Sequence, residues 1–100
     1  MGNYREGSAW NDEMELRCLL IFKVLEEERF PRKRQMELCR ELSRNSELDA
    51  TNLSAKVGNY KSAAGVNNSS NASANTVSMY RRHGTKSSAQ LRRLIETRNF

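Results

Sequence analysis

Carboxylates are missing from a long stretch of this sequence, because no Asp or Glu occurs between Asp49 and Glu96. The first fifty residues carry nine Lys and Arg against eleven Asp and Glu, a net charge of −2. The last fifty carry eight against one, a net charge of +7, and the two halves together give the formal net charge of +5. A surface of one sign attracts nucleic acid or acidic protein. The missing acids therefore predict a polyanion-binding surface in the second half.

Metal ligands and catalytic motifs are scarce as well. The sequence has one histidine, His83, and two cysteines, Cys18 and Cys39, which are too far apart along the chain to indicate a zinc site. It has no glycine-rich phosphate loop and no nucleophile with an obvious partner. We therefore expect no cofactor and no enzymatic activity. His83 is interpreted as either solvated or in contact with phosphate, and the cysteines as reduced core residues, with a disulfide between packed helices as the alternative.

Long apolar segments are also absent. The longest apolar run, residues 18–22, is much too short to span a bilayer. The first ten residues contain no apolar segment of the kind found in secretory signals. These two absences predict a cytoplasmic protein that makes no membrane contact.

Proline and β-branched residues are few, whereas Leu, Arg, Glu, Lys and Ala are abundant, which favours helices. The predicted fold is all-α. It is a compact bundle of about five short helices in a single domain over residues 10–98, with a flexible tail over residues 1–9. An ordered loop rich in Asn and Ser is expected between the third and fourth helices.

Capping residues and apolar spacing predict where these helices lie. Asn11 caps the first, whose broad apolar surface marks it as central to the domain. Pro31 is placed in the first turn of the second. The third is expected from about residue 51 to 63, closed by Gly65, and the fourth from about 73 or 75 to 83, with Val77 and Tyr80 facing inward. The last follows a capping box formed by Ser87 and Gln90.

The predicted third helix has one side made mostly of small residues. Leu53, Val57 and Tyr60 share its apolar side, whereas Gly58 and its neighbours form a nearly flat opposite side. Gly in mid-helix costs about 0.5–1 kcal/mol relative to Ala, so a flat surface there needs a reason. Two interpretations remain open: close packing against another helix, or a helix seated in or across a DNA groove.

Twelve residues are candidates for contact with nucleic acid. Basic side chains would contact phosphates, and Ser and Asn side chains would donate hydrogen bonds to the backbone or in a groove. For the two arginines that end the fourth helix, stabilisation of the helix end is the alternative role. The candidates are Ser54, Lys56, Asn59, Lys61, Asn67, Asn68, Asn71, Arg81, Arg82, Lys86, Arg92 and Arg93.

The pattern around the third helix resembles a known family. The residues that carry the resemblance are Arg44-Asn45, Leu53, Lys56, Asn59 and Tyr60, within residues 9–96. They are similar to the helical DNA-reading modules at the N-termini of HNH-type and Mcr-type restriction endonucleases, including the sulfur-binding domains. The resemblance implies a helical bundle that grips duplex DNA, either modified or unmodified, with its third helix and the following loop.

Two departures from the family qualify what the resemblance implies. This sequence has no HNH nuclease half, so the resemblance implies binding without cleavage. The Arg-x-x-x-Phe-Arg-Asn-Pro entry common in those modules is replaced by ELSRNSELDATN, which bears on recognition of a modified backbone or base. A stand-alone module of this kind would suit a phage or a mobile element.

Two functions follow from the sequence. The first is a non-catalytic duplex-DNA-binding module that uses a basic, Asn/Ser-rich surface from residues 51–93. The alternative is a small phage-type inhibitor or adaptor, whose basic half would occupy the nucleic-acid channel of a nuclease or a CRISPR-type effector. RNA binding has less support, because the few aromatic residues are expected in the core. Either a monomer or a homodimer is compatible with the first function.

Overall fold

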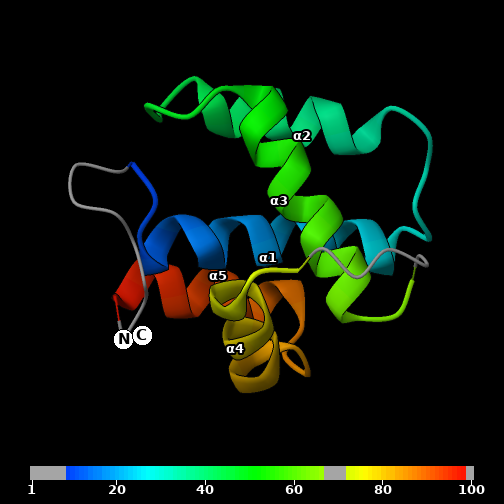
Figure 1. Ribbon diagram of the computed structural model, residues 1–100, viewed down its shortest axis with the longest axis vertical. Coiled ribbons are helices and arrows are strands. Elements are labelled where there is room, and N and C mark those ends of the chain that lie inside the picture. Colours follow the sequence, from blue (N-terminus) through cyan, green and yellow to red (C-terminus); the bar gives the residue numbers. More distant parts are fainter. Residues whose placement is uncertain (1–8, 67–71, 99–100) are drawn as a thin grey trace.

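The structure is a computed structural model that describes residues 9–66 and 72–98 (Figure 1). These ranges contain five helices and no strand: α1 (Asp12–Glu27), α2 (Arg34–Ser43), α3 (Ala50–Ala63), α4 (Ala74–His83) and α5 (Ser88–Thr97). The Cα radius of gyration is 12.5 Å and the overall dimensions are 34 × 28 × 28 Å. The predicted all-α, compact bundle is therefore confirmed. No helix in the described part of the chain is long and apolar enough to cross a membrane.

Helix α1 lies at the centre of the bundle and packs against all four other helices. In Figure 1 it runs between α2 on one side and α4 and α5 on the other, and α3 crosses in front of it, which agrees with the central position that its broad apolar surface predicted. Its fully buried residues, such as Leu19 and Phe22, meet Leu53 and Tyr60 of α3 and Leu91 of α5. Both cysteines are buried and free, so the interpretation of them as core residues is confirmed.

Side-chain caps fix the starts of four helices. Asn11 accepts a hydrogen bond from the Met14 amide at 2.8 Å, and the predicted capping box of Ser87 and Gln90 is complete. Asp49 and Ser73 cap α3 and α4 in the same way. The exception is α2, which begins at Arg34 after a left-handed residue that provides no side-chain cap. Pro31 therefore lies outside α2, and its predicted place in the first turn was wrong.

The N-terminal tail and the Asn/Ser loop are largely outside the described part of the chain. The predicted flexible tail, except for Ala9, and the predicted ordered Asn/Ser loop over residues 67–71 lie outside the described residues. Ala9 is half-buried and packs against the core. Gly65 ends α3 in the left-handed conformation, with a φ of 76°, as its position predicted.

Helix α4 is turned differently from the prediction. Its buried residues are Thr76, Met79 and His83, whereas Val77 is only half-buried. Tyr80 is also half-buried, although it packs against the core with its ring 6.3 Å from that of Phe22. The spacing of apolar residues along a helix does not predict which polar side chains will be buried. Here Thr76 and His83 take inward positions that the apolar pattern did not indicate, Tyr80 packs against the core as predicted, and Val77 does not.

His83 is a core residue, so its predicted contact with solvent or phosphate was wrong. It is 8% exposed, and neither ring nitrogen has a hydrogen-bond partner among the described residues. The end of α4 is drawn against α1 by Lys23, whose Nζ donates to the Gly84 carbonyl at 2.9 Å and pairs with Glu26 at 2.7 Å. The contact holds Gly84, the residue that follows His83, against α1, and the His83 imidazole is buried beside it.

The burial of His83 predicts a pH-dependent stability. Burial, followed by the nearby charges of Lys86 and Arg82, lowers the pKa of the imidazole from its ordinary 6.5. The unfolded chain therefore takes up this proton first as the pH falls. The contribution of the neutral imidazole to the free energy of unfolding is fully present above about pH 6.5. Below that pH it declines by up to about 1.4 kcal/mol per pH unit. Urea unfolding at pH 7.5 and 5.5 measures this decline, which His83→Leu should remove; an unchanged decline in that variant contradicts the assignment.

Candidate nucleic-acid interface

The structure describes nine of the twelve candidate residues, and it does not give them one common environment. Asn67, Asn68 and Asn71 lie outside the described residues. Of the remaining nine, two are engaged inside the helix packing, one is half-buried, and six are cations that form no ion pair within residues 9–66 and 72–98. The six cations are Lys61, Arg81, Arg82, Lys86, Arg92 and Arg93.

Lys56 is one of the two engaged residues, which corrects its predicted role as a phosphate contact. Its ammonium lies 2.9 Å from the Glu15 carboxylate and 3.1 Å from the Thr76 hydroxyl. It also lies 4.9 Å from the centre of the Trp10 ring. Its side chain is only 12% exposed. These contacts tie α3 to α1 and α4, so Lys56 acts as an internal ion-pair partner.

Ser54 is the other engaged residue. Its hydroxyl accepts a hydrogen bond from the Gln35 side-chain amide at 2.9 Å, and the same amide bonds to the Ser54 carbonyl at 3.1 Å. Ser54 therefore joins α3 to α2, which corrects its place on the predicted open side. Asn59 is half-buried and makes no side-chain hydrogen bond within the described ranges, so it remains a candidate.

The outward side of α3 is flat and faces open space. Its centre is formed by Thr51, Ala55 and Gly58, and α3 crosses in front of α1 in Figure 1. A Cβ atom built on Gly58 would meet no atom within 4 Å. Close packing of another helix at this glycine is therefore excluded for the described chain. The remaining interpretation is that a small residue here lets something outside the molecule approach the helix backbone.

Gly58→Ala tests that interpretation. Because the added methyl group meets nothing, we expect the variant to be more stable by about 0.5–1 kcal/mol, the ordinary gain of Ala over Gly in a helix. Urea unfolding measures the gain. If this side of α3 meets a ligand closely, the same variant also binds it more weakly. A gain in stability with no change in binding would show that the flat surface plays no part in recognition.

The pairing of charges explains why six cations remain uncompensated. Only Lys56 and Arg98 of the basic half form ion pairs in the described chain, and both do so with carboxylates of α1, Glu15 and Glu13. The one acid of the second half, Glu96, forms no ion pair in that part of the chain. The positive potential predicted from the sequence therefore survives folding at the other six positions.

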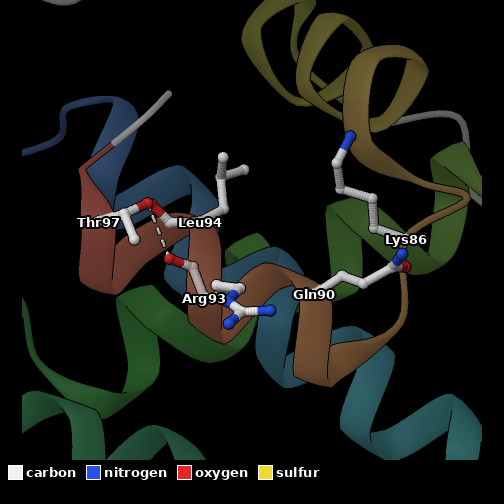
Figure 2. Close-up of a pocket in the computed structure, with 5 residues that line it drawn as sticks. All are labelled: Lys86, Gln90, Arg93, Leu94 and Thr97. Atoms are coloured by element: carbon white, nitrogen blue, oxygen red, sulfur yellow. Dashed lines mark hydrogen bonds between the residues drawn. The ribbon is translucent and has the colours of Figure 1, made fainter.

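A groove along α5 brings two of these cations together, Lys86 and Arg93. It has a volume of about 560 Å³ and is lined by Lys86, Gln90, Arg93, Leu94 and Thr97. Figure 2 shows Lys86 on the connection that precedes α5, and the other four side chains along α5 itself. Arg81 and Arg82 are exposed in the last turn of α4. We call Arg81, Arg82, Lys86 and Arg93 the α4–α5 cation set.

Arg92 lies on a different side of α5 from Arg93. It lines a separate pocket with Arg17 and Leu20 of α1. Its charge also helps to lower the pKa of Glu27, after the dominant hydrogen bonds from Ser88. We therefore leave Arg92 out of the α4–α5 cation set.

The described residues were compared with the requirements of a metal site and of a reactive thiol. No group of three or more His, Cys, Asp or Glu in them could hold a metal ion. Burial raises the pKa of the Cys39 thiol to about 11 and raises that of Cys18 even further. Both thiols are therefore protonated at neutral pH, in the state that is a poor nucleophile.

The residues that carry the family resemblance have mostly structural positions. Leu53 and Tyr60 belong to the core, Lys56 pairs with Glu15, and only Asn59 and Arg44-Asn45 retain surface exposure. The resemblance to restriction-endonuclease modules stays a prediction. Comparison with known proteins adds nothing to it, because no family model, curated protein or solved structure matches this chain.

Proposed function

We propose that this protein is a non-catalytic module that binds duplex DNA, chiefly through the phosphate backbone. The observation that carries the proposal is the α4–α5 cation set. Lys86 and Arg93 line one groove, and Arg81 and Arg82 are exposed in the last turn of α4, just before Lys86 in the chain. No carboxylate in the described residues lies within ion-pairing distance of any of the four. Phosphate contacts need only positive charge and hydrogen-bond donors on an accessible surface.

Counterion release gives the proposal a quantitative form. Each phosphate that the protein neutralises contributes about −0.9 to the slope of log affinity against log salt. Four cations therefore predict a slope of about −3.6, and further contacts would steepen it. The longest dimension of the molecule, 34 Å, corresponds to a duplex of about ten base pairs at about 3.4 Å per pair. One molecule should thus cover about one helical turn.

Fluorescence anisotropy with two unrelated 20-base-pair duplexes tests the proposal. We expect binding to both at 100 mM salt, with similar affinities and a salt slope of about −3 to −5. Similar affinities are expected because phosphate contacts carry no sequence information. Absence of binding to either duplex at 100 mM salt would refute the proposal.

A pull-down in the absence of DNA separates this function from the alternative of an inhibitor or adaptor. A nuclease or effector would use the same cations, because its nucleic-acid channel is built to receive a polyanion. If the protein forms a stoichiometric complex with another protein and does not bind free duplex DNA, the inhibitor or adaptor function is supported and the DNA-binding function is refuted. DNA binding without such a complex would support it.

A further inference from the structure

The turn between α1 and α2 carries cations that the sequence-based prediction did not include. Arg29, Arg32 and Lys33 lie in this turn and are exposed, and Lys61 of α3 reaches it. The Lys61 ammonium lies 5.5 Å from the centre of the Phe30 ring. Arg32, Lys33 and Lys61 line part of a small cavity of about 200 Å³, and Arg29 precedes it in the same turn. We call Arg29, Arg32, Lys33 and Lys61 the basic turn.

The acids that precede the basic turn are all engaged elsewhere. Glu26 pairs with Lys23 at 2.7 Å. Glu27 accepts hydrogen bonds from the Ser88 amide at 2.8 Å and hydroxyl at 2.7 Å. Glu28 pairs with Arg34 at 3.0 Å.

Those pairings leave the basic turn uncompensated. No carboxylate of the described residues forms an ion pair with any of its four cations. The net charge of the first fifty residues cannot show this, because in that sum the three glutamates cancel the charges of the cations that follow them. Folding directs the glutamates to other partners and leaves a local positive site.

The backbone of the turn is held in an unusual conformation. Arg29, Phe30 and Lys33 have φ values of 64°, 55° and 67°, in the left-handed region that side chains other than Gly and Asn disfavour. Each costs on the order of 1–2 kcal/mol. The Phe30 amide bonds to the Leu25 carbonyl at 2.7 Å, so the packing of the turn holds this shape. Two of the three disfavoured positions carry a cationic side chain.

The basic turn lies at the same end of α1 as the start of α5. The last turns of α1 hold the α4–α5 connection through two contacts, Lys23 to the Gly84 carbonyl and Glu27 to Ser88. The chain leaves α1 directly into the basic turn, which is the loop at the edge of the molecule in Figure 1. Lys86, a member of the α4–α5 cation set, belongs to that same connection. The connection that carries Lys86 therefore lies at the same end of α1 as the basic turn.

We infer that the basic turn is a second phosphate-binding site that contacts the backbone of the same DNA duplex. This inference rests on the proposed function. Its ligand is a backbone phosphodiester, because Arg and Lys side chains around a small cavity offer the positive charge and the hydrogen-bond donors that a phosphate group accepts. Loss of one phosphate contact lowers affinity by about eightfold at 100 mM salt and makes the salt slope shallower by about 0.9.

Three single variants of the full chain test the inference in the anisotropy assay. Arg32→Gln and Lys33→Asn each remove one cation from the basic turn. Arg40→Gln removes one exposed cation from α2 and is the matched control for the change in net charge. We expect about eightfold weaker binding and a shallower slope from the first two. We expect Arg40→Gln to bind within about twofold of the wild type.

Lys33→Asn also separates binding from folding. Asn tolerates the left-handed backbone better than Lys, so this variant should be at least as stable as the wild type while binding less well. Thermal unfolding measures that stability. Should Lys33→Asn unfold more readily, Arg32→Gln decides: weaker binding by that variant supports the inference, and wild-type binding overturns it.

The outcomes distinguish this inference from the proposed function. If the wild type binds no duplex, the proposed function fails and the inference fails with it. If Arg93→Gln weakens binding while Arg32→Gln and Lys33→Asn behave like Arg40→Gln, the inference alone is overturned. If Arg93→Gln, Arg32→Gln and Lys33→Asn all weaken binding while Arg40→Gln binds like the wild type, the proposed function and the inference are both supported.

Discussion

Replacing Glu15 by Leu is expected to destabilise the fold by about 3–5 kcal/mol, the usual cost of leaving one partner of a buried ion pair alone. Glu15 is 1% exposed, and its carboxylate lies 2.9 Å from the Lys56 ammonium. It also accepts a hydrogen bond from the Tyr60 hydroxyl at 2.8 Å. The variant would leave both groups inside the fold without their main partner. Small domains have total free energies of unfolding of about 5–15 kcal/mol, so the expected loss is a large fraction of the total stability.

Urea unfolding followed by circular dichroism measures this loss. The matched control is Glu13→Leu, on the same helix, whose carboxylate pairs within the described residues with Arg17 and Arg98, side chains that are 38% and 78% exposed. Such pairs contribute about 0–1 kcal/mol, so the control should change little. Equal effects of the two substitutions would contradict the assignment of Glu15 to a buried network.

The double variant Glu15→Leu with Lys56→Met completes the test. Two apolar side chains in place of a buried ion pair are often neutral or stabilising, so most of the lost stability should return. A large coupling free energy in this cycle would mark Lys56 as a structural residue. It would also explain why Lys56 should not be counted among the phosphate contacts, since its substitution would affect folding before it affected binding.

Local features of the sequence predicted the helices well. Asn11, Ser87 and Gln90 cap helices because their side chains reach amides only three residues away. The broad apolar surface of the first helix correctly indicated its central position. These interactions lie within one helical turn, so the order of residues along the chain is sufficient to predict them.

Contacts between distant residues could not be predicted in this way. The hydrogen bonds from Lys23 to the Gly84 carbonyl and from Ser88 to Glu27 each join residues 61 positions apart. Nothing near Glu27 in the sequence indicates that it will cap α5 and not neutralise Arg29. Which charges remain uncompensated is therefore a property of the folded chain.

The basic turn shows a second limit of sequence patterns. A left-handed residue is normally predicted from Gly or Asn, and Gly65 was recognised in that way. Arg29, Phe30 and Lys33 carry no such indication, because their conformation is imposed by packing around Phe30, whose ring lies 6.0 Å from that of Phe22. The sequence therefore predicted a helix start at Pro31, where the structure has a strained turn.

Replacing all four members of the α4–α5 cation set by Gln should have the largest effect on DNA binding. At about eightfold for each lost phosphate contact, the affinity at 100 mM salt should fall by about three to four orders of magnitude. The salt slope should become shallower by about 3.6. Because none of the four forms an ion pair within the described residues, the variant should keep most of its stability.

Comparing two double variants separates a local surface from overall charge. Arg81→Gln with Arg82→Gln removes two cations of the set, whereas Arg40→Gln with Arg44→Gln removes two exposed cations near the end of α2. Both lower the net charge equally, so only a localised interface makes them differ. We expect about sixtyfold weaker binding from the first and little change from the second.

The arginines of α4 also favour the negative end of their helix. If that were their whole role, Arg81→Gln with Arg82→Gln would lower the unfolding free energy while the DNA titration matched that of the α2 control.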